Sequence, residues 1–242
     1  MSNNMTLLVV GNDGDQNRVA SDAGSVTDVA RASGFVVRYH SSRAGRWPSL
    51  TEIHAVVVLG SGSGAWDDSI PWITAELEFI SEAVRADIPV LGICFGAQIL
   101  TRAIGGSVEP QAGSEHGITS ISITPGVDLP VGPWLEMHFD RCLLPDSAAV
   151  LATTTAAVQV FTTQRSMGVQ FHPEITPATF QGWQATMTTA EIAAFDAIGV
   201  DFDAIGTELS SNAAAYRDGF EAVWRLFLTT ARLEERDLHA ER

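Results

Sequence analysis

The sequence has few cysteines and no long apolar run. Two cysteines, Cys94 and Cys142, are too few to build a disulfide framework in a chain of 242 residues. No apolar run approaches the ~20 residues that a membrane-spanning helix needs. The first ten residues, MSNNMTLLVV, lack the basic start and the apolar length of a signal peptide. We therefore expect a cytoplasmic protein that is not an integral membrane protein.

Basic residues are also scarce, at 14 against 29 acidic ones, which gives a formal charge of -15. A negative field of this size opposes phosphate backbones and anionic membrane surfaces, so neither nucleic acid nor a membrane is an expected partner. The two cysteines and six histidines show no zinc-ligand spacing such as C-x-x-C or H-E-x-x-H. We predict no metal site and no cofactor.

What the chain does contain is typical of a globular protein with a sizeable core. It is 45% hydrophobic and 18% charged. No internal repeat, low-complexity tract or Pro/Gly/Ser-rich linker marks a second domain. We therefore expect one domain over residues 1–242.

Short β-branched runs alternate with longer segments of helical apolar spacing in the first half of the chain. This alternation predicts an α/β fold, a mostly parallel sheet with helices on both faces. Residues 54–60 and 89–93 are almost continuously apolar, which predicts that these strands lie in the centre of the sheet. The pattern also predicts a helix over residues 18–34.

From residue 117 onward, closely spaced extended segments predict a mixed or antiparallel excursion of the sheet, followed by a helical C-terminal tail. In TPATFQGWQATM, Thr176 is the expected N-cap and Pro177 the first helical residue. The acidic stretch DAIGVDFDAIGTE is interpreted as a mobile connection or a lid. Apolar residues at helical spacing predict a packing stripe on the last helix: Phe220, Val223, Trp224 and Phe227.

Cys94 lies between two glycines in GICFG, directly after an apolar run and before a helical segment. Gly-x-Cys-x-Gly is the cysteine form of the nucleophile elbow, a tight strand-to-helix turn that raises its central side chain above the carboxyl edge of the sheet. The amides of the helix that begins near Phe95 favour the thiolate. A buried structural cysteine is the alternative, and the flanking glycines favour the nucleophile.

The segment GVQFHPEIT offers a base and an acceptor that orients it. His172 and Glu174 are two residues apart on an expected extended segment, so both side chains point to the same side. Pro173 biases His172 away from helix. An isolated His-x-Glu is more often a surface pair, but a cysteine nucleophile needs such a base and acceptor. The three residues predict a catalytic triad of Cys94, His172 and Glu174.

The segments PVLGICFGAQIL and GVQFHPE together resemble motifs of the class I, or triad-type, glutamine amidotransferases. The likeness is greatest to the glutaminase domain of GMP synthetase and to small stand-alone relatives. Weaker blocks follow in the order that this family has: VVVLGSGSGAWDD, AIGGSV, SEHG and MHFD. The resemblance extends from about residue 54 to about residue 183 and implies a flavodoxin-like architecture.

The resemblance implies a role for each member of the triad. Cys94 attacks the γ-carboxamide carbon of glutamine, forming a γ-glutamyl thioester and releasing ammonia, while His172 transfers protons and Glu174 orients the imidazole. The oxyanion hole is expected to consist of the backbone N–H groups of Phe95 and Ser61.

Five further positions are candidates for substrate binding by the same resemblance. Gly60 and Gly62 flank Ser61 in a Gly-rich loop. An ordinary flexible turn is the alternative interpretation of this loop. It is not a phosphate loop, because no Lys-Ser/Thr follows it. Gln98 matches a position that helps to hold the substrate. His138 and Phe139 match the block whose backbone receives the amino-acid end of glutamine. For His138, a structural role as a hydrogen-bonded histidine is an equal alternative. Phe139 occupies a position where the family has glycine.

Three functions are compatible with these residues. The first is hydrolysis of the side-chain amide of glutamine, with ammonia used by a separate synthase subunit, because no ATP-binding loop is found in this chain. The alternative is a stand-alone γ-glutamyl amide or peptide hydrolase with the same triad. A non-catalytic binding module is disfavoured, since it would not need all three triad residues. We expect a catalytic core at residues 1–187 and a helical extension at 188–242.

Overall fold

A central sheet of eight strands organises the molecule, and the computed structural model describes residues 5–12 and 14–233. The strands of the sheet are β1 (Thr6–Gly11), β2 (Val36–Ser41), β3 (Ala55–Val58), β4 (Val90–Ile93), β6 (Ser122–Ile123), β8 (Ala149–Thr153), β9 (Val158–Thr163) and β10 (Ser166–Val169). Their order is β2-β1-β3-β4-β10-β9-β8-β6, in which the first five pair in parallel and the last three pair antiparallel. A separate antiparallel ribbon consists of β5 (Ser107–Thr119) and β7 (Trp134–Leu143).

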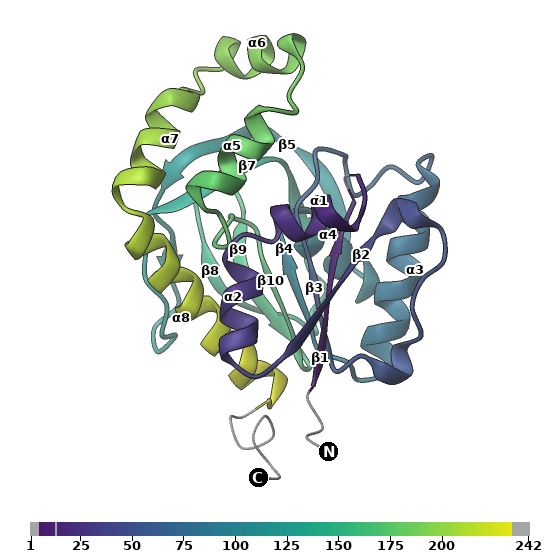
Figure 1. The fold of residues 1–242 in the computed structure, drawn as a ribbon. Coiled ribbons are helices and arrows are strands. Elements are labelled where there is room, and N and C mark those ends of the chain that lie inside the picture. Colours follow the sequence, from purple (N-terminus) through teal and green to yellow (C-terminus); the bar gives the residue numbers. More distant parts are fainter. Residues whose placement is uncertain (1–4, 13, 234–242) are drawn as a thin grey trace.

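Helices cover both faces of the sheet (Figure 1). On one face, Leu7 and Val9 of β1 pack with α1 (Gln16–Asp22), α2 (Ser25–Ala32) and α8 (Ala213–Ala231). On the other face, Leu8 and Val10 pack with α3 (Pro71–Arg85) and α4 (Phe95–Ala103). This alternation along one strand is the expected signature of a sheet that is buried on both sides. Two short 3-10 helices, η1 (Ser42–Ala44) and η2 (Leu50–Glu52), lie between β2 and β3.

The predicted fold class is confirmed. The apolar runs at 54–60 and 89–93 became β3 and β4, which lie in the middle of the sheet and pair with each other in parallel. The predicted antiparallel excursion corresponds to β8 and β9 and to the β5–β7 ribbon. The mostly parallel part therefore ends at β10, and the antiparallel strands extend the sheet beyond it.

The prediction of one continuous helix over residues 18–34 is wrong. The chain forms two short helices, α1 and α2, separated by Gly24, which has a φ of 50°. A helix requires a negative φ, and glycine is the residue that most easily adopts this conformation. The break turns the chain toward the end of β10.

The tail is helical as predicted as far as Ala231, and the part of the predicted extension at 234–242 lies outside the described residues. Thr176 caps α5 (Pro177–Gln184) by accepting a hydrogen bond from the N–H of Thr179, and Pro177 is its first residue. The acidic stretch that was interpreted as a mobile connection or a lid is mostly helical, because it covers the end of α6 (Thr189–Ala197) and most of α7 (Phe202–Ser211). Its role as a connection or a lid stays a prediction. The predicted apolar stripe on α8 is buried against the sheet: Phe220, Val223, Trp224 and Phe227.

A third apolar cluster joins β7 to the helices that follow β10. Leu135 of β7 packs with Phe180 of α5 and with Ile205 and Leu209 of α7. Figure 1 shows α6 at the end of the molecule toward which the parallel strands run. The helical tail thus bends over the carboxyl edge of the sheet.

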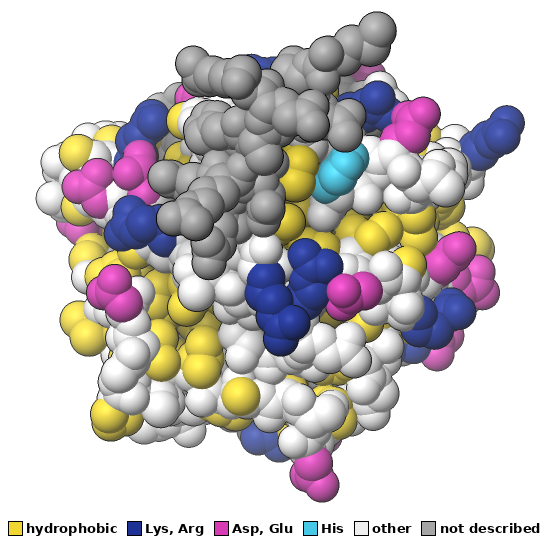
Figure 2. Space-filling model, turned by 90° about the horizontal axis from the view of Figure 1, so that it is seen from below, with side chains coloured by type: hydrophobic (Ala, Val, Ile, Leu, Met, Phe, Trp, Pro, Cys, Tyr) yellow, Lys and Arg dark blue, Asp and Glu magenta, His cyan; other side chains and the backbone are white. Residues whose placement is uncertain are grey.

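The opposite end of the molecule has a mixed surface. In Figure 2 its described part shows acidic, basic and apolar side chains interspersed. Within residues 5–12 and 14–233, no helix combines the length and the apolarity needed to cross a bilayer.

Glu76 is a carboxyl group buried in α3. Its side chain is fully shielded from solvent, and its Oε2 accepts a hydrogen bond from the Ser42 hydroxyl. Burial raises the pKa of Glu76 from 4.5 to about 7, while the hydrogen bond from Ser42 opposes the shift. The folded state therefore keeps this proton at a pH at which the unfolded chain has lost it, and stability falls as the pH rises from about 4.5 to 7.

Replacing Glu76 by glutamine is expected to remove this fall of stability with rising pH. Glu76→Gln should unfold at nearly the wild-type temperature at pH 4.5, where the wild-type carboxyl is neutral. At pH 8 the variant should be more stable by up to ~3 kcal/mol, since about one pKa unit is worth ~1.4 kcal/mol. Thermal unfolding across this pH range measures the difference. A difference that does not grow with pH would contradict the assignment.

Candidate active site

Cys94 lies in the sharp turn between β4 and α4. β4 ends at Ile93, α4 begins at Phe95, and the residue between them has a φ of 52°, in the left-handed region that side chains disfavour. The backbone N–H of Cys94 donates to the carbonyl oxygen of Val169 in β10 at 2.8 Å. This hydrogen bond fixes the turn to the neighbouring strand and holds Cys94 at the carboxyl edge of the sheet, as a nucleophile elbow requires.

Close packing of the backbone requires the two glycines that flank Cys94. A Cβ atom at Gly92 would lie 2.3 Å from the carbonyl oxygen of Gly96. A Cβ atom at Gly96 would lie 2.1 Å from the carbonyl oxygen of Val58 in β3. Neither distance is tolerable, so α4 can pack this closely on β3 and β4 only with glycine at both positions.

His172 and Glu174 follow β10 and form a buried pair. Nδ1 of His172 is 2.9 Å from Oε1 of Glu174. In a neutral imidazole this contact assigns the proton to Nδ1 and leaves Nε2 as the base. The backbone N–H of His172 donates to the carbonyl oxygen of Leu135 in β7 at 2.8 Å, so the residue is held by its backbone and by its ring.

Gly60, just after β3, lies against both Cys94 and His172. A Cβ atom at Gly60 would be 2.7 Å from Cε1 of His172 and 3.6 Å from Cβ of Cys94. The ends of three parallel strands, β3, β4 and β10, therefore bring these residues together although 112 positions separate Gly60 from His172. This is the edge at which open α/β sheets place their sites.

The surroundings of His172 favour its charged form. Burial on its own lowers the pKa of His172, but the Cys94 sulfur and the Glu174 carboxylate outweigh burial and raise this pKa well above its ordinary value. His172 can therefore carry a proton next to the Cys94 sulfur, which is the arrangement of a cysteine nucleophile with its base.

The junction of α1 and α2 supports Glu174 from the other face of the sheet. The N–H of Ser25 donates to the carbonyl oxygen of Glu174 at 2.9 Å. A Cβ atom at Gly24 would lie 2.1 Å from the same oxygen. The glycine that breaks the first helical segment thus allows the backbone to hold Glu174, a role that the sequence analysis missed because Gly24 was included in a helix.

Gln170 is a second residue that the sequence analysis missed. Its Nε2 is 3.7 Å from Sγ of Cys94, and its Oε1 is 3.5 Å from Nε2 of Gln98. The signal was present in VQFHPE, because the two-residue alternation that links His172 to Glu174 also includes Gln170. Gln98 is buried behind the nucleophile, and its role in substrate binding stays a prediction.

β7 passes beside the nucleophile. The carbonyl oxygen of Met137 is 3.9 Å from Sγ of Cys94. Both ring nitrogens of His138 face other groups of the protein. Nδ1 is 3.0 Å from the carbonyl oxygen of Asp140, and Nε2 is 3.1 Å from the carboxylate of Glu136. The predicted use of the His138 and Phe139 block for the amino-acid end of the substrate stays a prediction.

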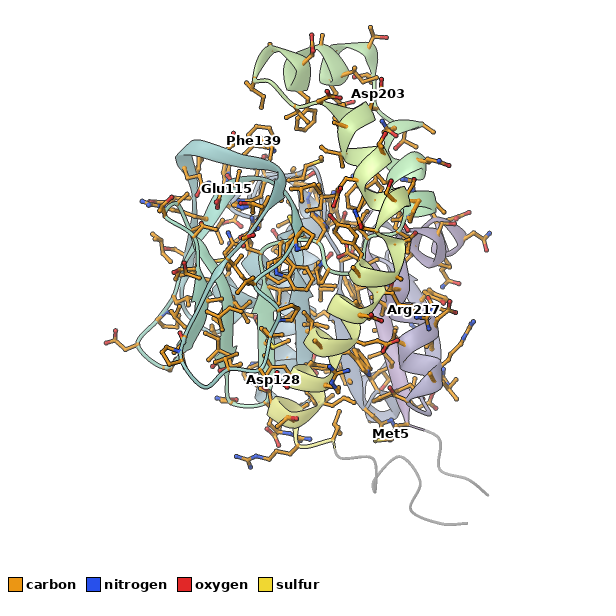
Figure 3. All side chains as sticks on the ribbon, turned by 90° about the vertical axis from the view of Figure 1, so that its left-hand side faces the viewer. Met5, Glu115, Asp128, Phe139, Asp203 and Arg217 are labelled. Atoms are coloured by element: carbon orange, nitrogen blue, oxygen red, sulfur yellow. The ribbon has the colours of Figure 1, made fainter. Side chains whose placement is uncertain are left out.

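One aromatic side chain contacts the site, and three others pack together between the β5–β7 ribbon and α6. Phe139 is 52% exposed, and its ring lies 4.5 Å from His116 and 5.8 Å from Phe195 of α6, measured between centroids. Trp183 of α5 lies edge-on to His172 at 4.8 Å. Figure 3 shows Phe139 on the side of the molecule where α6 lies, far from Met5 at the opposite end. We call these four residues (His116, Phe139, Trp183 and Phe195) the aromatic rim.

The remaining predicted positions lie at the same edge. Phe95 is the first residue of α4, where backbone N–H groups have no acceptor within the helix. Ser61 follows Gly60 directly, its Oγ accepts a hydrogen bond from the N–H of Ser63 at 3.1 Å, and Gly62 is exposed. The oxyanion roles of Phe95 and Ser61 and the substrate contacts of Gly60 and Gly62 stay predictions.

The second cysteine has a different environment. Cys142 is a free, buried thiol in β7, with its Sγ 3.7 Å from Oε1 of Gln170. Burial raises the pKa of Cys142 to about 12, so it remains a thiol at neutral pH. In the described part of the chain, no group of three or more His, Cys, Asp or Glu side chains is suited to hold a metal ion.

Comparisons with known proteins agree with this geometry. The family model for class-I glutamine amidotransferases matches residues 30–183, more than half of the chain. GMP synthase (glutamine-hydrolyzing) of Gloeothece citriformis is 32% identical over 130 residues, which cover 50% of this chain and 23% of that protein. The GMP synthase of Malacoplasma penetrans is 35% identical over 103 residues, which cover 39% of this chain and 20% of that protein. The matched region thus spans less than a quarter of these relatives.

Solved structures give the same fold. A glutamine amidotransferase of Thermotoga maritima superposes with a TM-score of 0.80 at 22% identity, covering 93% of this chain and 98% of that one. A glutamine amidotransferase of Methylobacillus flagellatus has a TM-score of 0.72 at 18% identity, with 94% and 95% covered. The chain belongs to the class I glutamine amidotransferase family, which confirms the resemblance, the fold class and the enzyme class predicted from the sequence.

The contact between Gly60 and the His172 ring can be tested by adding one methyl group. Gly60→Ala must displace the ring from Cys94 and should lower kcat/KM ~100-fold, the cost expected for a misplacement of about 1 Å in an active site. The control is Gly206→Ala in α7, whose added Cβ would be 3.7 Å from Phe180, an ordinary contact, and should retain full activity. Wild-type activity in Gly60→Ala would contradict the arrangement.

Proposed function

We propose that this protein hydrolyses the side-chain amide of glutamine through a cysteinyl γ-glutamyl thioester and that the ammonia is used by a separate acceptor enzyme. The observation that carries the proposal is the convergence of Cys94, His172 and Glu174 at the carboxyl edge of the sheet, with the His172 ring 2.9 Å from the Glu174 carboxylate. Membership of the class I glutamine amidotransferase family supports the choice of glutamine.

In the first step, the Cys94 thiolate attacks the γ-carboxamide carbon of glutamine. A carbon–sulfur bond forms, the carbonyl π electrons move to oxygen, and a tetrahedral oxyanion results. The His172 imidazolium then donates its proton to the amide nitrogen, the carbon–nitrogen bond breaks, and ammonia leaves the γ-glutamyl thioester behind.

In the second step, water hydrolyses the thioester. Neutral His172 removes a proton from water, hydroxide adds to the thioester carbon, and the carbon–sulfur bond breaks to release glutamate and the Cys94 thiolate. Throughout both steps, Glu174 accepts a hydrogen bond from the Nδ1–H group of His172. This bond keeps the imidazole in one tautomer and stabilises its charged form.

Two backbone donors are assigned to the oxyanion. Phe95 is the first residue of α4, so its N–H lies at the positive end of the helix dipole beside Cys94. Ser61 follows Gly60, whose backbone is in contact with the catalytic pair. Each such donor is worth ~3 kcal/mol of transition-state stabilisation.

The substrate contacts are assigned to the residues around this pair. Gly60, Gly62 and the backbone of His138 and Phe139 would receive the glutamyl part, because they line the strand ends and the β7 segment beside Cys94. The relatives whose glutamine-hydrolysing part matches are GMP synthases, and this agrees with delivery of ammonia to a separate synthase.

The aromatic rim favours a second candidate, a stand-alone hydrolase of γ-glutamyl amides. Trp183 contacts the His172 ring, and Phe139 and Phe195 contact each other and His116. Burial and the charge of His138 lower the pKa of His116 to about 4, so its ring is uncharged near neutral pH. Trp183 beside the proton donor, together with the uncharged cluster around Phe139, suits a leaving amine with an apolar body better than it suits ammonia.

Steady-state assays on the isolated protein distinguish the two candidates. A glutaminase that serves a partner should release ammonia from glutamine without a preference for larger γ-glutamyl amides. A value of kcat/KM at least ~100-fold higher for a bulky γ-glutamyl amide corresponds to ~2.7 kcal/mol of transition-state preference and would replace the first candidate by the second. Absence of turnover with every γ-glutamyl compound would contradict both.

A further inference from the structure

β7 carries buried charges next to the nucleophile that the proposed reaction does not use. Glu136 and His138 are two residues apart on β7, and Glu115 pairs with His138 across the ribbon. We call these three residues the charge cluster. The side chains of Glu136 and His138 are each 1% exposed, so water does not screen their charges.

The contacts of His138 favour a proton on both ring nitrogens. Nδ1 faces the carbonyl oxygen of Asp140 at 3.0 Å. Nε2 faces the carboxylates of Glu136 at 3.1 Å and of Glu115 at 3.4 Å. A carbonyl oxygen only accepts, so Nδ1 is the donor to Asp140, and the two carboxyl groups that face Nε2 favour a second proton on the ring, which makes it an imidazolium. Burial on its own lowers the pKa of His138, but the two carboxylates raise it well above its ordinary value, in agreement with the geometry.

The two carboxylates of the cluster are not equivalent. Oε2 of Glu115 also accepts hydrogen bonds from Thr154 at 3.1 Å and from Gln159 at 3.0 Å. Glu136 is held by its ion pair with His138, and its oxygens make no hydrogen bond to the described residues. Because both oxygens are shielded from solvent, Glu136 is not placed to contact the substrate directly.

The cluster is close enough to the catalytic pair to act on it electrostatically. His138 follows Met137, whose carbonyl oxygen contacts Sγ of Cys94, and its charge interacts with that of Cys94. The charge of Glu136 interacts with that of His172, whose backbone N–H donates to Leu135, the residue before Glu136. The hydrogen bonds of β7 therefore fix the distance between the cluster and the pair.

We propose that the charge cluster is a positioning device for the reaction, in which the His138 imidazolium stabilises the Cys94 thiolate and the carboxylates of Glu136 and Glu115 limit this effect. The inference rests on the proposed function only in that Cys94 is the nucleophile. It adds a role for the His138 side chain that is separate from the predicted role of its backbone.

Opposite signs of charge make the proposal testable. Removing the positive charge of His138 should make the thiolate harder to form, whereas removing a negative charge from Glu136 or Glu115 should make it easier. Other ionisable groups face this region: His172 and Cys142 act on Cys94, and His116 and Asp140 interact with His138. All of them are kept unchanged in the variants, so only the cluster charge differs.

The experiment is the pH dependence of Cys94 alkylation by iodoacetamide, with the modified cysteine identified by peptide mass spectrometry. The pH midpoint should rise by about one unit in His138→Gln and fall by up to about one unit in Glu136→Gln, the size expected for one nearby charge. Glu115→Gln should also lower the midpoint and replaces Glu136→Gln if that variant fails to fold, and His138→Asn replaces His138→Gln in the same case. The matched control is His54→Gln, at the amino end of β3 and therefore at the opposite edge of the sheet, which should leave the midpoint unchanged.

Shifts of opposite sign in the histidine and glutamate variants support the proposal. Shifts of the same sign, or no shift in any folded variant, overturn it, because mere structural damage does not depend on the sign of the charge. Glutamine turnover is measured in parallel. Opposite shifts without turnover in the wild type would reject the proposed function and keep this inference, whereas turnover with unchanged midpoints would do the reverse.

Discussion

The strained turn at Cys94 is the constraint on which the site depends. A non-glycine residue with a φ of 52° costs ~1–3 kcal/mol, and the surrounding structure must supply that energy. It does so with the hydrogen bond from Cys94 to Val169 and with the close packing of α4 on β3 and β4, which requires glycine at positions 92 and 96. The same turn places the sulfur at the start of α4, where helix N–H groups favour a thiolate. One turn therefore determines both the backbone geometry at Cys94 and the surroundings of its sulfur.

The other catalytic groups are held by backbone contacts from distant parts of the chain. Leu135 of β7 accepts the N–H of His172, and Glu174 accepts the N–H of Ser25. These hydrogen bonds connect the end of β10 to the ribbon on one side and to the α1–α2 junction on the other. The side chains can therefore be buried and close together without a long network of side-chain hydrogen bonds among them.

The sequence was informative where the chemistry depends on local pattern. The glycines around Cys94 and the His-x-Glu spacing predicted both parts of the candidate triad, and continuous apolar runs predicted β3 and β4 at the sheet centre. Local pattern did not reveal contacts between distant segments. Gly24 was included in a helix because apolar periodicity continues across it, although its role depends on a carbonyl group 150 positions later.

The helices in the acidic stretch of the tail were not evident for a related reason. Its many aspartates and glycines are typical of loops, but Asp201 caps α7, and apolar residues such as Ile205 and Leu209 anchor that helix against β7 and α5. The charge cluster was similarly hidden, since Glu115 becomes a partner of His138 only when β5 pairs with β7. The β5–β7 ribbon has an irregularity between Pro110 and Glu115, which shifts the pairing of its strands. The two-residue alternation of side chains along each strand does not predict such a shift.

The central claim is that Cys94 is the nucleophile for a glutamyl carbonyl group. A diazoketone analogue of glutamine tests it most directly, because this compound alkylates a cysteine only after its glutamyl part has been bound beside it. Mass spectrometry should find one label per chain, on the peptide that contains Cys94, and glutamine should protect against labelling. Labelling of Cys142 instead, or no labelling of a folded protein, would contradict the account.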